Sequence, residues 1–75
     1  MKGDHLRELC LEAAKAKIAV DKAHGKGSVL LDSKKEIYNA KRQYFLEKCL
    51  ELGFPAVYAM AEINRVYENE IKKGK

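Results

Sequence analysis

The residues best suited to chemistry in this sequence are basic side chains grouped around an aromatic one in the middle of the chain. On an expected helix over residues 33–52 they fall on one side: Lys34, Lys35, Tyr38, Asn39, Lys41 and Arg42. Positive charges with an interleaved aromatic ring can meet phosphates or an acidic groove of another protein. The alternative is a solvated face whose lysines keep a small protein soluble.

The same side of this helix turns apolar toward its C-terminal half, beginning at Phe45. A basic region that leads into an apolar one resembles a protein interface, in which charges steer and aromatic side chains anchor, more than a nucleic-acid track. We therefore expect a partner-binding surface made of Lys34, Lys35, Tyr38, Lys41, Arg42 and Phe45.

A second candidate interface is the pair Leu11 and Ile18, which lie one heptad apart on the first expected helix. Residues at this spacing can form a coiled-coil-like seam with a second copy or a partner. The alternative is that they cover the apolar segment Val29–Leu31 of the same chain.

Metal-binding and catalytic patterns are weak. The soft ligands are His5, Cys10, His24 and Cys49, and their spacing matches no zinc motif. Both cysteines sit among apolar neighbours, whereas a reactive thiol needs exposure and positive surroundings. Three short helices also seldom enclose an active-site pocket. We expect no enzyme, no metal and no cofactor.

Composition narrows the class of protein further. The chain has 75 residues and a net charge of +4, from 12 Lys and 3 Arg against 11 acids. Because Arg supplies most bidentate phosphate and base recognition, an excess of Lys speaks more for solubility than for sequence readout. Two cysteines make no disulfide framework, and no signal peptide or membrane span is evident. These features predict a cytoplasmic protein that does not enter a membrane.

Three helices would position these residues, over about 4–24, 33–52 and 55–72. Asp4 is the expected N-cap of the first, and Ser33 with Glu36 forms a capping box for the second. Gly53 followed by Pro55 separates the second helix from the third. The basic tail over residues 72–75 is expected to fray. We predict one all-α domain over residues 1–75, a three-helix bundle.

The second helix should lie between the other two, because its apolar residues fall on two sides. Val29–Leu31, in the connection before it, should close one end of the bundle; a helical start at Ser28 is the alternative. Since two short neighbours leave apolar surface over, we expect a homo-oligomer or a stable complex with a partner.

These patterns favour a small non-enzymatic interaction protein, a cytosolic regulator or inhibitor that docks on a larger protein, as short reading frames of phages and mobile elements often encode. The alternative is a basic nucleic-acid-binding protein that uses Lys34, Lys35, Lys41, Arg42 and the tail over residues 72–75. Salt separates the two, because phosphate binding weakens steeply as salt rises.

Overall fold

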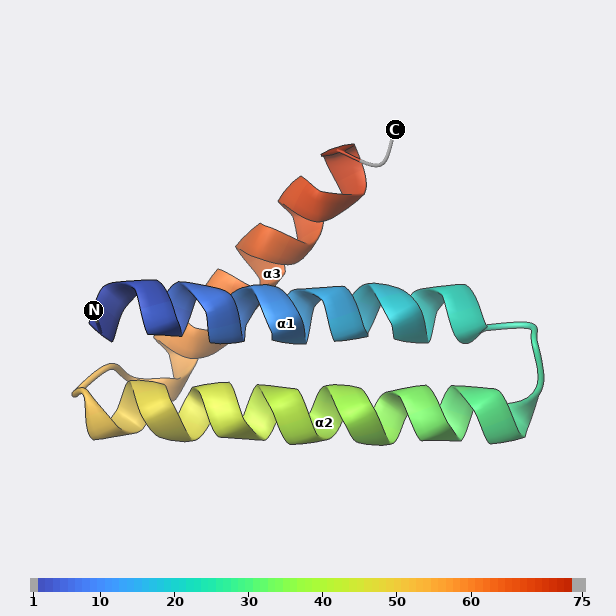
Figure 1. The fold of residues 1–75 in the computed structure, drawn as a ribbon, viewed down its shortest axis with the longest axis horizontal. Coiled ribbons are helices and arrows are strands. Elements are labelled where there is room, and N and C mark those ends of the chain that lie inside the picture. The colour runs from blue at the N-terminus through green and yellow to red at the C-terminus, as the bar shows by residue number, and fades with distance from the viewer. Residues whose placement is uncertain (1, 74–75) are drawn as a thin grey trace.

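A computed structural model describes residues 2–73, which form three helices: α1 (Lys2–Ala23), α2 (Ser28–Glu51) and α3 (Ala56–Lys73). The described chain has no strand, so the prediction of an all-α three-helix bundle is confirmed. Helices α1 and α2 run antiparallel as a hairpin, and α3 crosses α1 on one side of that hairpin (Figure 1).

Helix α2 begins at Ser28, five residues before the predicted start at Ser33. The capping-box prediction is wrong, because Ser33 lies inside the helix, and the alternative start at Ser28 is confirmed. The chain reverses at Gly25 and Gly27, whose φ angles of 86° and 113° suit glycine, and α2 follows at once without a side-chain cap. Val29 is therefore helical and 84% exposed, and does not close the end of the bundle.

The end of α2 agrees with the prediction from Gly53. Gly53 has a φ of 90°, and its N–H donates to the carbonyl of Leu50 at 3.1 Å, while the Phe54 N–H donates to the carbonyl of Cys49 at 2.8 Å. This pair of bonds is a Schellman motif, which satisfies the last carbonyls of a helix and turns the chain sharply. It sends the chain back toward α1.

The remaining helix ends differ from the predictions by one or two residues. Helix α1 begins at Lys2, so Asp4 lies within it and is not the N-cap. Helix α3 begins at Ala56, directly after Pro55, and extends to Lys73. Lys72 and Lys73, predicted to fray, are helical, whereas residues 74 and 75 of the predicted tail lie outside the described part of the chain.

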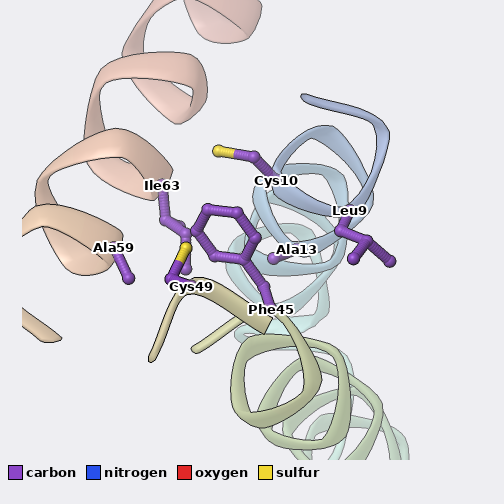
Figure 2. Packing of buried hydrophobic residues seen from close by; sticks show 7 residues of the cluster. All are labelled: Leu9, Cys10, Ala13, Phe45, Cys49, Ala59 and Ile63. Carbon is purple, nitrogen blue, oxygen red and sulfur yellow. The ribbon is translucent and has the colours of Figure 1, made fainter. Parts of the chain in front are cut away.

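The hydrophobic core lies where the three helices meet, around the ring of Phe45, which is 2% exposed (Figure 2). Cys10 and Ala13 reach it from α1, and Ala59 and Ile63 from α3. Burying one such large side chain stabilises the fold by about 1.5–3 kcal/mol. The full cluster is Leu9, Cys10, Ala13, Phe45, Cys49, Ala59 and Ile63.

Helix α1 packs against both α2 and α3, whereas α2 and α3 have the smallest contact with each other. The prediction that the second helix is central is therefore corrected. Ala13, Ala16 and Ala23 are all buried on α1, and such small side chains let neighbouring helices approach closely. Only the Phe45 and Cys49 side of α2 is covered.

The other apolar side of α2 is open to solvent. Ile37 is 44% exposed, Tyr44 47% and Leu50 54%. Their neighbour Phe45, one residue from Tyr44, is buried. The expectation that two short helices leave part of α2 uncovered is thus met on one side of this helix.

Candidate interaction surfaces

The predicted partner-binding residues of α2 do not form one continuous surface. Phe45, the expected anchor, lies in the core and is out of reach of a partner, so its assignment is corrected. The reason is that α1 and α3 both pack on its side of α2. Lys35 is exposed, and Lys34 is half-buried. The basic residues therefore do not lead to an accessible anchor at Phe45.

Three of the predicted residues are engaged within the chain. Lys41 Nζ lies 2.9 Å from Glu12 Oε1 on α1, so part of its charge is neutralised. The Arg42 guanidinium carbon lies 5.8 Å from the ring centroid of Tyr38, a cation–π contact. Arg42 Nε is buried without a hydrogen-bond partner among the described residues. These contacts reduce the charge available to a ligand.

Leu11 and Ile18, the second predicted interface, are both half-buried on α1. The segment Val29–Leu31, which they were alternatively expected to cover, is part of α2 instead. Neither residue belongs to the core cluster. An interface through this pair stays a prediction.

The α2–α3 turn carries an exposed apolar group that the sequence reasoning missed. We call it the apolar tip; it consists of Leu50, Leu52, Phe54, Val57 and Tyr58, all exposed. The rings of Phe54 and Tyr58 stack with centroids 4.7 Å apart and planes inclined by 18°. The signal was present in the sequence, since Leu52 and Phe54 flank the helix-ending Gly53, where polar residues are usual.

A hollow of about 300 Å³ adjoins the apolar tip at Tyr58, between the first half of α1 and α3. Two of the three arginines of the chain, Arg7 and Arg65, line it together with Glu62. Arg65 Nη2 and Nε lie 2.7 and 2.8 Å from Glu62 Oε2, and this hydrogen bond raises the pKa of Arg65. The other residues that line the hollow are Leu6, Cys10, Phe45 and Val66.

The Cys10 thiol on the wall of this hollow is not a nucleophile at neutral pH. Burial, with the nearby negative charge of Glu62, raises its pKa from 9.0 to about 11. Burial likewise raises the pKa of Cys49. Because the thiolate is the reactive species, both cysteines act as small hydrophobic residues of the core.

A third surface lies on the side of the hairpin away from α3. Tyr44 of α2 lies there, and Leu30 and Ile37, also exposed, precede it at seven-residue intervals and therefore share its side of the helix; we call these three residues the α2 ridge. A groove of about 310 Å³ runs beside it, lined by Leu9, Glu12, Ala40, Lys41 and Tyr44. Helix α3 contributes no residue to this lining, which places the groove on the open side of the hairpin.

Metal ligands do not gather among the described residues: no three His, Cys, Asp or Glu side chains lie close enough together to hold an ion. Within residues 2–73, no helix has both the length and the apolar character that crossing a membrane requires. Comparison with protein-family models, with curated proteins and with solved structures gave no match. The function must therefore be argued from the surfaces of the chain itself.

Proposed function

We propose that this chain is a small non-enzymatic interaction protein of the cytoplasm, a regulator or inhibitor that docks on a larger protein through the apolar tip. The observation that supports this proposal is the exposure of five large apolar side chains within nine residues of the α2–α3 turn. A cluster of exposed apolar side chains on a small protein often marks an interaction site.

The side chains of the tip are of the types that dominate binding energy. Aromatic residues that are held rigid before binding lose little conformational entropy when they are buried. Phe54 and Tyr58 meet this condition because they are stacked on each other, and the Schellman turn at Gly53 fixes the backbone between α2 and α3. Each apolar side chain covered by a partner adds about 1.5–3 kcal/mol before the costs of association.

The hollow beside the apolar tip adds charged groups to one edge of the proposed interface. Arg7 lies on its wall and forms no ion pair with residues 5–73, whereas Arg65 is neutralised by Glu62. An arginine at the edge of an apolar contact can receive a carboxylate with two parallel hydrogen bonds. The proposed partner surface is therefore apolar at its centre and acidic at one edge.

Nucleic-acid binding through α2 is the second candidate function, and the charges of α2 support it less well. Of its proposed contacts, Lys41 is paired with Glu12 and Arg42 is half-buried against Tyr38. Fewer free charges release fewer counterions, so this route would give weaker binding to phosphates. Salt dependence distinguishes the two functions: the apolar tip should hold its partner from about 50 to about 200 mM salt, whereas phosphate contacts should not.

The test is capture of a partner from nuclease-treated extract of the native host, with a matched pair of variants. Val57→Glu places a charge in the tip, and Val29→Glu makes the same change at the same position of the first turn of α2, at the other end of the hairpin. Both valines are exposed, so neither change should disturb the fold. We expect one protein to be recovered in stoichiometric amount by wild type and by Val29→Glu, but not by Val57→Glu. Equal recovery by both variants would contradict the proposal.

A further inference from the structure

The hollow between α1 and α3 has walls that are largely apolar and reach the core of the protein. Phe45 and Cys10, which belong to the core cluster (Figure 2), line it together with Leu6 and Val66, which pack against that cluster. Tyr58, which also lines the hollow, is part of the apolar tip. The hollow therefore connects the apolar tip to the core.

The charged side chains that line the hollow leave one positive charge over. They are Arg7, Glu62 and Arg65, and Glu62 Oε2 already lies 2.7 Å from Arg65 Nη2. Arg7 is exposed and forms no ion pair with residues 5–73. An arginine presents two parallel N–H donors that match the two oxygens of a carboxylate. The lining is thus complementary to a group that is apolar and carries a single negative charge.

The size of the hollow limits what can enter. About 300 Å³ is at the lower end of the range for small-molecule sites, so it suits one large residue and not a longer segment of a partner. The apolar walls and Arg7 must then be satisfied by the same residue. Aspartate and glutamate carry a carboxylate without a large apolar group. A large apolar residue at the end of a chain carries both, because its own backbone ends in a carboxylate.

We infer that the hollow binds the C-terminal residue of the partner, a large apolar residue such as leucine or phenylalanine whose carboxylate pairs with Arg7. This inference rests on the proposed function, because the partner then extends from the hollow, past Tyr58, onto the apolar tip. Capture of a terminal carboxylate is a recurring mode of peptide recognition.

Titration of the isolated full chain with N-acetyl-leucine, followed by NMR of the backbone amides, tests the binding. This ligand has about 12 non-hydrogen atoms, for which we expect a dissociation constant of about 1–5 mM and shifts at Cys10, Glu62 and Val66. N-acetylglycine lacks the apolar side chain and N-acetyl-leucine amide lacks the charge. Each should bind at least about fivefold more weakly. No shift at these residues up to about 50 mM, or equal binding of the amide, would overturn the inference.

A matched pair of variants tests the role of Arg7. Arg7→Gln and Lys22→Gln change the net charge equally, and both positions are exposed on α1, with Lys22 near its other end. We expect Arg7→Gln to weaken the binding of N-acetyl-leucine by at least about fivefold and to leave the binding of the amide unchanged. Lys22→Gln should leave both unchanged. Equal effects of the two variants would reveal only a general attraction for anions and would overturn the inference.

Two blocked peptides distinguish a chain end from an internal segment. Acetyl-alanyl-leucine ends in a free carboxylate, whereas acetyl-alanyl-leucyl-glutamate amide carries the same charge on a side chain and has a blocked end. The inference predicts tighter binding of the first, and equal or tighter binding of the second would contradict it. These experiments need no partner, so they can fail while docking through the apolar tip holds, and partner capture can fail while they succeed.

Discussion

Lys41 on α2 and Glu12 on α1 form an ion pair, with Nζ and Oε1 2.9 Å apart, on the side of the hairpin that α3 does not cover. The pair connects the two helices beside the groove and partly neutralises a lysine that the sequence alone would assign to a ligand. It shows how the packing of two helices redistributes the charges that a linear reading groups together.

The Lys41–Glu12 pair should contribute little to stability. The Lys41 and Glu12 side chains are 40% and 54% exposed, and pairs open to solvent are worth about 0.2–1 kcal/mol. A double-mutant cycle with Lys41→Ala and Glu12→Ala, read by urea unfolding at micromolar concentration, should give a coupling free energy in that range. The coupling should shrink in about 1 M salt, where screening is strong. A coupling above about 2 kcal/mol would mean that the pair is far less solvated than the structure shows.

Phe45→Ala should lower the free energy of unfolding by about 3–5 kcal/mol, because it removes the ring at the centre of the core. Gln43→Ala, two residues earlier on the exposed side of α2, is the matched control and should change stability by less than about 0.5 kcal/mol. Chemical denaturation followed by circular dichroism measures both. A small effect at Phe45 would show that the core lies elsewhere.

Ser33→Ala distinguishes the observed start of α2 from the predicted one. If Ser33 capped the helix, its removal would cost about 1 kcal/mol. Since Ser33 lies inside α2, alanine should be neutral or stabilise the protein by up to about 0.5 kcal/mol. Gly27→Ala should instead be destabilising by about 1 kcal/mol or more, because Gly27 has a φ of 113°. Thermal unfolding of both variants provides the measurement.

The stability of the protein should decline at alkaline pH because of Cys10. Its pKa is raised from 9.0 to about 11 in the folded state, so above pH 9 the unfolded chain loses a proton that the folded chain keeps. The contribution of the protonated Cys10 thiol to the free energy of unfolding is complete below pH 9. It is lost as pH rises toward 11, at no more than about 1.4 kcal/mol per pH unit. The difference in free energy of unfolding between wild type and Cys10→Ala should therefore narrow over this interval. A constant difference would show that the thiol is not shielded.

The helix ends could be predicted where one residue type has a single structural use. Gly53 before Pro55 marks such a position, and it ends α2 with a left-handed residue as expected. Ser33 and Glu36 do not mark a helix end in this way, because a serine three residues before a glutamate also occurs inside helices. The two glycines at positions 25 and 27 were the stronger signal for the start of α2.

The surfaces were harder to predict, because α2 is apolar on two sides and periodicity does not say which side the neighbours cover. Tyr44 and Phe45 are adjacent aromatic residues, yet one is exposed and the other is in the core. Which of the two side chains is buried depends on where α1 and α3 pack, and this is set by contacts between residues far apart in the sequence. The apolar tip, by contrast, could have been inferred from Leu52 and Phe54 on either side of Gly53.

The most direct test of the central claim is site-specific photo-crosslinking in the native host. A photoreactive amino acid at Val57, in the apolar tip, is compared with the same amino acid at Asn69, an exposed polar position further along α3. Docking through the tip predicts one discrete adduct at Val57, heavier than two copies of the chain, and none at Asn69. No adduct at Val57, or the same adduct at both positions, would contradict the account.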